Sequence, residues 1–211
     1  PAGENLVKAA CVIGNRNRAA GRCGLGAVMG SKNLKAIAVR GTGSIEVAQP
    51  ERFMEAVNVA RDKIDKSPFF NSEAKLRKYG PDGIFVETNE SCNIPYRNFQ
   101  DSYIPKESAK KLDPEFLLRC KVRDLACFSC PLHCSNFLRI DEGPYAGLTT
   151  EGIELEDAMN FGGKLAIDYA PALIKAHSLV NQLGLDQDNA TGVLAWAFEC
   201  YQRGILTQKD T

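Results

Sequence analysis

The chain has 211 residues, and its 26 basic and 26 acidic side chains leave no formal net charge. This balance gives no support for nucleic-acid binding, because a nucleic-acid-binding protein would show an excess of basic residues. The sequence has no run of about 18 apolar residues, so no membrane-spanning helix is predicted. The 44% apolar content is typical of a globular protein with one large domain, or one domain and part of another. Eight unevenly spaced cysteines fit a reducing compartment better than a secreted disulfide framework, so a cytoplasmic location is expected.

The chain starts at Pro1 without an initiator Met and ends at Thr211, and we interpret it as a fragment of a longer polypeptide. Its first predicted element is a short helix over residues 4–13, where apolar side chains recur at helical spacing before a glycine. A strand is predicted over residues 35–40, whose Lys-Ala-Ile-Ala-Val-Arg sequence is followed by a glycine-containing turn.

The segment from Arg16 to Lys35 combines four glycines with five basic residues. Glycine lets the backbone turn through positive φ and approach a ligand closely, and exposed amides with nearby Arg or Lys suit a phosphate group. The segment is not a Walker loop, because the Gly-Lys-Ser/Thr ending is missing, and no strand leads directly into it as in a dinucleotide fingerprint. The residues alone leave two interpretations open, an anion-cradling loop and a merely tight structural loop.

Residues 41–50 mark an expected boundary, where a strand-and-loop region gives way to helices. A proline in the first turn begins a predicted helix over residues 50–66. The buried face expected for this helix consists of Phe53, Ala56, Val57, Ala60 and Ile64. Further helices are predicted over residues 71–78 and 114–121, and a long loop over residues 80–106.

The stretch Cys127-Phe-Ser-Cys130-Pro-Leu-His-Cys134 places three thiols at C-x2-C-x3-C spacing on one tight turn. Thiolates are soft, anionic ligands that suit an iron–sulfur cluster or zinc. No second C-x2-C completes a four-cysteine zinc ribbon. The spacing therefore favours a cluster, with zinc and inert buried thiols as the alternatives. Buried free thiols are expected at Cys11, Cys92, Cys120 and Cys200.

The last part of the chain is predicted to be mainly helical. A strand over residues 136–140 and a loop over residues 141–150 precede helices over residues 153–161, 167–183 and 189–203.

Polar side chains interrupt the apolar pattern of these helices. Glu154 and Glu156 are candidates for acid–base work, since paired carboxylates are used in this way, with an ordinary solvated helix face as the alternative. His177 is expected to be an ordinary core or surface histidine. Trp196 and Phe198 are expected in the core.

Five motifs, found in the same order, resemble the tungsten-containing aldehyde ferredoxin oxidoreductases. The run from Arg18 to Val39 is the longest of them, and the cysteine triad matches the [4Fe-4S] motif of that family. The segment 95–100 resembles its Pro-x-Arg-Asn-Phe-Gln loop, and the segment 152–156 its Gly-Pro-Glu-Tyr-Glu sequence. The turn 181–186 resembles its Asp-x-x-Gly-Leu-Asp/Cys pterin loop.

The resemblance implies a tungsten (or molybdenum) bis-molybdopterin cofactor, magnesium bridging the pterin phosphates, and one [4Fe-4S] cluster. It implies an α+β fold, in which residues 1–45 end a β-rich pterin-binding domain and residues 46–211 form a mainly α-helical domain carrying the iron–sulfur cluster motif. The cofactor-binding residues implied are Arg18, Ala19, Gly21, Gly24, Gly26, Asn181, Gly184, Leu185 and Asp186. The cysteine triad would hold the cluster. Glu156 would be the catalytic carboxylate near tungsten, where burial among apolar neighbours is expected to raise its pKa.

The implied function is oxidation of an aldehyde to a carboxylic acid, with electrons passing through the cluster to ferredoxin or an electron-transfer subunit. Reduction of an aromatic acyl-CoA thioester, as by the tungsten subunit of a benzoyl-CoA reductase, is a second interpretation. An electron-transfer module with only a cluster is a third. A homo-oligomer or hetero-complex is expected. The fourth cluster ligand is expected beyond Thr211, with Cys92 as its strongest rival inside the chain.

Overall fold

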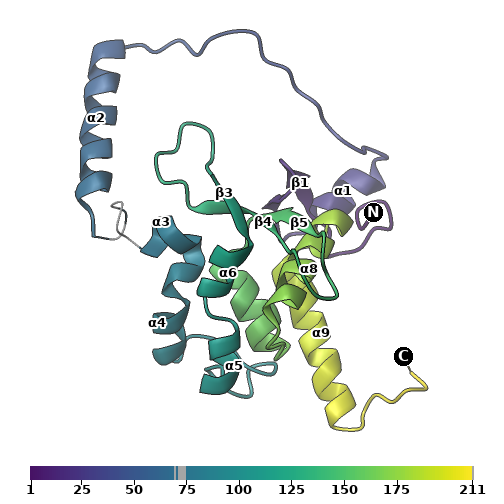
Figure 1. Cartoon of the computed structure of the whole chain (residues 1–211). Helices are drawn as coiled ribbons and strands as arrows, with labels where there is room; N and C mark the ends of the chain where they lie inside the picture. The colour runs from purple at the N-terminus through teal and green to yellow at the C-terminus, as the bar shows by residue number, and fades with distance from the viewer. Residues whose placement is uncertain (69, 71–74, 211) are drawn as a thin grey trace.

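The computed structural model describes residues 1–68, 70 and 75–210. These residues form a mixture of strands and predominant helices, which confirms the predicted α+β class (Figure 1). The strands are β1 (Val12–Gly14), β2 (Arg18–Ala20), β3 (Lys121–Leu125), β4 (Ser135–Arg139) and β5 (Thr149–Glu151). The α-helices are α1 (Leu25–Ser31), α2 (Pro50–Lys66), α3 (Lys75–Tyr79), α4 (Phe85–Glu90), α5 (Lys106–Lys111), α6 (Glu115–Cys120), α7 (Leu155–Asp157), α8 (Ala170–Leu183) and α9 (Gln187–Gln202). The 3-10 helix η1 (Gly80–Ile84) and the π-helix η2 (Ala158–Lys164) complete the described elements.

The hydrophobic core lies in the second half of the chain, where α8 is packed between two clusters. One cluster joins α4, the following loop and η2 around Phe85, Ile94 and Phe161. The other joins α6, β4 and α8 around Leu117, Leu138 and Ile174. Because both clusters contact α8, this helix is fixed relative to the sheet on one side and to η2 on the other.

A three-stranded antiparallel sheet with the order β3-β4-β5 carries the predicted cluster motif. Leu125 pairs with Ser135, so residues 126–134 form the loop of the β3–β4 hairpin. Figure 1 shows this loop projecting beyond the ends of β3 and β4. The predicted strand over residues 136–140 is therefore confirmed as β4, and the cysteine triad lies in a hairpin loop.

The N-terminal residues form the small antiparallel hairpin β1–β2, in which Ile13 pairs with Ala19. The helix predicted over residues 4–13 is wrong, since turns lead into β1 instead. The reason is contact with α1: the carbonyl of Gly3 lies 1.9 Å from where a Cβ of Gly30 would sit. Such close packing of backbone on backbone favours an irregular segment over a regular helix at residues 4–11.

Residues 27–68 contain no buried residue. The strand predicted over residues 35–40 is wrong, because these residues pair with no neighbouring strand in the described part of the chain. The helix predicted over residues 50–66 is confirmed as α2, but its apolar face is exposed, with Phe53 52% accessible. Figure 1 shows α2 standing apart at the end of a long extended segment.

The middle of the chain is more helical than predicted. The predicted loop 80–106 begins with η1 and α4, and only its second part is irregular. Residues 71–74 of the helix predicted over 71–78 lie outside the described residues, and α3 covers the rest. The predicted helix over 114–121 is confirmed as α6.

The last three predicted helices are confirmed with one change of type. The segment 153–161 starts as the single turn α7 and widens into the π-helix η2, a rare form that is frequent at functional sites. Gly184 ends α8 in the left-handed conformation at φ 73°. Trp196 and Phe198 lie exposed on α9, so their expected core position is wrong. No helix within the described ranges is long and apolar enough to cross a membrane.

Candidate functional site

The two segments with implied cofactor-binding residues meet at the β1–β2 hairpin. The amide of Cys11 donates to the carbonyl of Gly184 at 2.9 Å. Ala10 and Leu185 form an antiparallel bridge next to it. The turn 181–186 therefore lies directly against the start of the glycine-rich segment, although the sequence places them far apart.

Asp186 joins the two segments through its side chain, which is buried. Its Oδ1 accepts the Asn189 amide at 2.9 Å and so caps the N-terminus of α9. Its Oδ2 accepts the Arg22 amide at 2.9 Å. A Cβ on Gly21 would lie 2.5 Å from the same oxygen, so this contact needs a glycine there. One carboxylate thus fixes the glycine-rich segment to α9.

Asp188, two residues further on, ties the same segment to the π-helix. Its carboxylate accepts from the Asn160 amide at 2.8 Å and lies 3.6 Å from the Lys164 ammonium. The Arg22 guanidinium also bonds to it. Burial raises the pKa of Asp188, but the Asn160 hydrogen bond and the two cations outweigh this and lower it.

Packing explains two of the glycines implied as cofactor contacts. A Cβ at Gly24 would lie 2.8 Å from the Lys8 carbonyl, and one at Gly26 would lie 2.6 Å from the Cys11 carbonyl. The tight structural loop, one of the two interpretations left open by the sequence, therefore accounts for both. A phosphate contact at these positions stays a prediction.

A run of left-handed residues precedes α1. Arg22, Cys23 and Gly24 have φ values of 56°, 55° and 68°. For a non-glycine residue this conformation costs roughly 1–3 kcal/mol and is concentrated at ligand sites and switches. Asp186, which holds the Arg22 amide, is one contact that maintains the run.

Two arginines of the hairpin reach acidic partners across the site. Arg18 Nη1 lies 3.0 Å from Glu154 Oε1, and Arg16 Nη1 lies 3.7 Å from Glu151 Oε1. Glu154 is the N-cap of α7 in a capping box with Asp157, whose Oδ2 accepts the Glu154 amide at 2.8 Å. Burial raises the pKa of Glu154, and Arg18 opposes that rise. The hairpin is therefore anchored to α7 and β5 by charge pairs.

Glu156 is exposed at the surface of the described chain. The expectation that apolar neighbours bury it is wrong here, because it follows the capping residue Glu154 and faces out of the first turn of α7. The buried carboxylate of this segment is Asp157, which is 1% exposed. The catalytic role implied for Glu156 stays a prediction that rests on the resemblance.

His177 is the centre of a buried hydrogen-bond network. Its Nδ1 lies 2.8 Å from Asp157 Oδ1, and its Nε2 lies 2.9 Å from the Glu151 carbonyl oxygen. The Asn181 amide lies 3.2 Å from Nε2 and also donates to the His177 carbonyl at 3.1 Å. Burial lowers the pKa of His177, but Asp157 outweighs it and the pKa is raised. The expected satisfied histidine is thus confirmed, and it links β5, α7 and the end of α8.

Asp82 of η1 lies behind this network and is 3% exposed. Its Oδ2 has no hydrogen-bond partner among the described residues. Burial raises the pKa of Asp82 well above its usual value, and Asp157, Glu154 and Glu156 add to the rise. A buried carboxyl without a partner is costly to stability and calls for an explanation.

The predicted cluster ligands lie in the open β3–β4 loop. Cys127 is exposed, and Cys130 and Cys134 are half-buried. The Cys130 amide donates to the Cys127 carbonyl at 3.0 Å, which forms the predicted turn. Phe128 is fully exposed. Within the described ranges no three His, Cys, Asp or Glu side chains are placed to hold a metal ion, so the thiols do not converge as expected.

The remaining cysteines divide by burial. All eight are free thiols. Cys11, Cys120 and Cys200 are buried as expected, whereas Cys92 is exposed, which makes that expectation wrong.

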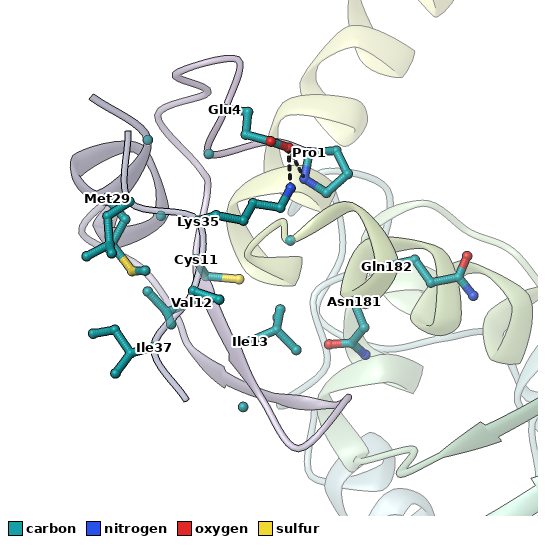
Figure 2. Close-up of a pocket in the computed structure, with 17 residues that line it drawn as sticks. Pro1, Glu4, Cys11, Val12, Ile13, Met29, Lys35, Ile37, Asn181 and Gln182 are labelled. Atoms are coloured by element: carbon teal, nitrogen blue, oxygen red, sulfur yellow. Dashed lines mark ion pairs between the residues drawn. The ribbon is translucent and has the colours of Figure 1, made fainter. Parts of the chain in front are cut away.

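A row of three hollows runs from the cysteine loop to the turn 181–186. The first, about 200 Å³, is lined by Cys127 and shares Asn17 and Glu151 with the second, about 390 Å³. The second shares Ile13 and Asn181 with the third, about 450 Å³. Figure 2 shows the third hollow, with Ile13 of β1 and Asn181 at the end of α8 on its border. Cys127 of the triad and Arg18, Gly26, Asn181 and Gly184 of the implied cofactor residues therefore border three neighbouring hollows, each of which shares lining residues with the next.

Comparison with known proteins decides the family. A family model described as aldehyde ferredoxin oxidoreductase, domains 2 and 3, matches residues 55–211, and its N-terminal domain matches residues 1–41. The chain belongs to the aldehyde ferredoxin oxidoreductase family. The tungsten-containing aldehyde ferredoxin oxidoreductase of Pyrococcus abyssi is 40% identical over 213 residues, covering 100% of this chain and 33% of that protein. The chain therefore spans about a third of the length of such relatives.

Other proteins that are similar to this chain carry other names. The aliphatic sulfonate oxidoreductase WOR-like subunit of Pyrococcus furiosus is 33% identical over 99% of this chain and 32% of that protein. A solved structure, the active site complex BamBC of benzoyl coenzyme A reductase with 1,5 dienoyl-CoA, matches with a TM-score of 0.75 and 26% identity. That match covers 99% of this chain and 32% of the other. The fold is therefore shared among proteins named for different substrates.

Two residues of the site, Asp82 and Asp157, were missed from sequence, as was the pairing of His177 with Asp157. Asp82 follows a proline in a stretch predicted to be a loop, and Asp157 lies next to Glu156 in a segment predicted to be a helix. The available signal was the pair of a histidine and an acid on adjacent apolar helices, which predicts a buried charge pair. The sequence held nothing that brings Asp82 to the same place.

Proposed function

We propose that this chain is the part of a tungsten-containing oxidoreductase that holds one side of a bis-molybdopterin cofactor and three ligands of a [4Fe-4S] cluster. In this proposal the whole protein oxidises an aldehyde to a carboxylic acid. The observation that carries it is the row of three neighbouring hollows, sharing lining residues, that extends from Cys127 to Asn181. An electron-transferring pair of centres needs such adjacency, and the chain offers thiols at one end and the implied pterin turn at the other.

The residues around the hollows fit an anionic cofactor. Arg16 and Arg18 line them and supply cationic, hydrogen-bonding side chains suited to phosphate. Each arginine pairs with one acidic side chain, Arg16 with Glu151 and Arg18 with Glu154. A single partner orients the guanidinium group without fully neutralising the positive charge around it. Ala19, on the same strand as Arg18, would help to hold the pterin or its magnesium, with the family resemblance as the only support. Asn181 borders two of the three hollows.

The donor set of the β3–β4 loop fits an iron–sulfur cluster by its chemistry. It provides three free thiols within eight residues, none of them in a disulfide. Burial raises the pKa of the Cys134 thiol, and Glu154 adds to the rise, so ligation would release a proton there. When bound, the tungsten cofactor supplies two-electron oxidation and the cluster supplies one-electron transfer to ferredoxin or a partner subunit.

The chain's own residues bind and orient in this proposal. Arg18, fixed by Glu154, positions the cofactor phosphates, and the Asp186 turn holds the glycine-rich segment against α9. Glu156 is proposed as the proton acceptor near tungsten, with its position in the family motif as the only support. Since it is exposed here, the cofactor and the rest of the protein would have to provide its desolvation.

A second candidate function is reduction of an aromatic acyl-CoA thioester. It is favoured by one observation, the match to the BamBC complex over 99% of this chain. Parallel assays of the full-length protein with aldehydes and with aromatic acyl-CoA thioesters separate the two. An electron-transfer module with only a cluster is a third candidate, and it leaves the hollow beside Asn181 without a purpose.

Metal and pterin analysis of the anaerobically purified full-length protein tests the proposal. We expect tungsten, pterin and iron together, and Arg18→Ala should lower tungsten and pterin while iron is retained. Arg139→Ala is the matched control, because Arg139 is another half-exposed arginine with one acidic partner, Asp141 at 2.7 Å, and lines none of the three hollows. Iron without tungsten or pterin in the unaltered protein would contradict the proposal and favour the cluster-only module.

A further inference from the structure

Asp157 and His177 form a buried pair at 2.8 Å. The buried Asp82 lines a small cavity with Ile153, Ala158 and Ile174, which lie on the segments that carry this pair. The three polar residues Asp82, Asp157 and His177 are here called the buried triad. They come from three elements, η1, α7 and α8, and each is 5% exposed or less. The triad does not line the hollows. It touches them through Glu151 and Asn181, which both border the 390 Å³ hollow.

The hydrogen-bond contacts of His177 require a proton on each of its two ring nitrogens. Its Nδ1 faces a carboxylate oxygen of Asp157 and its Nε2 faces the carbonyl oxygen of Glu151, so both ring nitrogens face acceptors. A neutral imidazole has only one N–H to donate. Both contacts are satisfied when His177 is an imidazolium paired with an ionised Asp157. The Asn181 amide, near Nε2, has its own acceptor in the His177 carbonyl.

The surroundings of Asp82 call for a third proton. Burial raises the pKa of Asp82, the acids Asp157, Glu154 and Glu156 add to the rise, and His177 opposes it. His177 is already paired with Asp157 at 2.8 Å. An ionised Asp82 would therefore give the buried triad a net negative charge, whereas a neutral Asp82 leaves it balanced.

The groups that face the triad from the neighbouring elements are consistent with a neutral Asp82. From β5 the facing group is the Glu151 carbonyl, and from α7 it is Glu154, already paired with Arg18 of β2. Asp82 itself lines a cavity of about 20 Å³ together with Asp113 and apolar side chains. This volume admits about one water molecule, which a neutral carboxyl could bond.

We infer that Asp82 is held as a neutral carboxylic acid next to the His177–Asp157 ion pair, and that this proton-balanced triad positions Glu151 and Asn181 at the border of the cofactor hollow. His177 is the positioning residue, since it contacts both. Loss of the Asp82 proton would place an unpaired charge behind the ion pair and loosen both contacts. The positioning role rests on the proposed function, whereas the neutral state of Asp82 does not.

The sign of the pH effect follows from the raised pKa of Asp82. The contribution of a group whose pKa is raised by folding is fully present below its unfolded pKa and is lost as the pH rises through the folded value. For a carboxyl this loss begins near about pH 4. Asn has the shape of the neutral acid but cannot ionise, so Asp82→Asn should escape the loss.

The first arm of the test is the thermal midpoint of the full-length protein at several pH values. We expect Asp82→Asn to unfold at a higher temperature than the unaltered protein at about pH 8, by roughly 3 °C or more, with the gap closing near about pH 4. Asp62→Asn, an exposed position on α2, is the control and should show no such pH-dependent gap. A midpoint for Asp82→Asn below that of the unaltered protein at pH 8, or a gap equal at both pH values, overturns the neutral state.

The second arm measures pterin retained after incubation across the same pH range. We expect the unaltered protein to release pterin as the pH rises and Asp82→Asn to retain it, while His177→Gln loses tungsten and pterin at every pH and keeps its iron. Equal pterin release by the unaltered protein and Asp82→Asn overturns the positioning role. Absence of pterin from the unaltered protein overturns the proposed function instead, and the first arm still decides the state of Asp82.

Discussion

The two halves of the candidate site differ in how far the polypeptide itself builds them. At the hairpin junction, where residues 8–26 meet residues 181–188, backbone hydrogen bonds and the buried Asp186 carboxylate fix the chain. In the cysteine loop, residues 126–134, a single turn hydrogen bond is formed and Phe128 is fully exposed. The first region is fixed by contacts within the chain, and the second has few of them.

The difference teaches what each ligand must contribute. A pterin that docks on the hairpin junction meets positioned arginines and backbone, and so costs little ordering on binding. A cluster bound by the cysteine loop would have to order that loop itself, because binding by thiolates and local folding are one process. Perturbing the two regions separately should therefore give different kinds of loss.

The largest effect is expected at the cysteine loop. Cys130→Ser in the full-length protein removes a thiolate from a set with no other support, so most of the iron and the cluster's paramagnetic signal should disappear. Iron analysis and electron paramagnetic resonance measure this. Cys92→Ser, at an exposed cysteine outside the triad, is the control and should keep its iron. Iron loss in Cys92→Ser instead would make Cys92 the fourth ligand and end the expectation that it lies beyond Thr211.

The next largest effect is expected at Asp186. Asp186→Ala removes the α9 cap and the partner of the Arg22 amide together, which should lower the free energy of unfolding by about 2 kcal/mol. Asp186→Asn keeps an acceptor oxygen and should lose less than half of that. Urea unfolding of the cofactor-free protein measures both. Equal stability of all three proteins would show that the junction is not preorganised by this carboxylate.

Turnover should separate Glu156 of α7 from Glu154, the residue that caps this helix. Glu156→Gln should lower turnover roughly 100-fold or more with tungsten retained, if it accepts a proton as proposed. Glu154→Gln should instead lower tungsten content, because it weakens the Arg18 pair. Steady-state rates expressed per bound tungsten distinguish the two losses. The reverse pattern would exchange the roles and give the proton acceptor to Glu154, whose pKa burial already raises.

The smallest effect is expected from Phe128→Ala. Its side chain is fully exposed and contributes no burial, so the free energy of unfolding of the cofactor-free protein should change by less than about 0.5 kcal/mol. Gly26→Ala is the contrasting variant, since the new Cβ would meet the Cys11 carbonyl at 2.6 Å and should destabilise the hairpin junction clearly. If Phe128→Ala were the more damaging of the two, the order of the two regions would be reversed.

The parts of the fold that could be predicted from sequence are those set by local pattern. Helices α2, α6, α8 and α9 follow helical apolar spacing and their glycine or proline boundaries. The strand expected over residues 35–40 fails because a strand also needs a partner, and no neighbouring strand is present in the described part of the chain. The exposed face of α2 fails for the same kind of reason, since spacing predicts an apolar stripe but not what covers it.

The site could be predicted only where the residue types and the spacing of a motif indicate its chemistry. The cysteine triad and the turn 181–186 were singled out in this way, and their ligand roles stay predictions. The hydrogen bond between Cys11 and Gly184 shows that the glycine-rich segment lies against that turn. The buried triad could not be predicted, because only the packing of η1 against α7 and α8 brings Asp82 near the His177–Asp157 pair. Contacts between segments that lie far apart in the sequence produce no local pattern of residue spacing from which they could be predicted.

Hydrogen exchange of the full-length protein, with and without its metals and pterin, tests the contrast between the two regions most directly. We predict that amides of residues 8–26 and 181–188 are protected in both states, with a modest gain when pterin is bound. Amides of residues 126–134 should exchange rapidly without iron and become protected when the cluster is present. Protection of the cysteine loop in the metal-free protein, or rapid exchange of the hairpin junction there, would contradict the account.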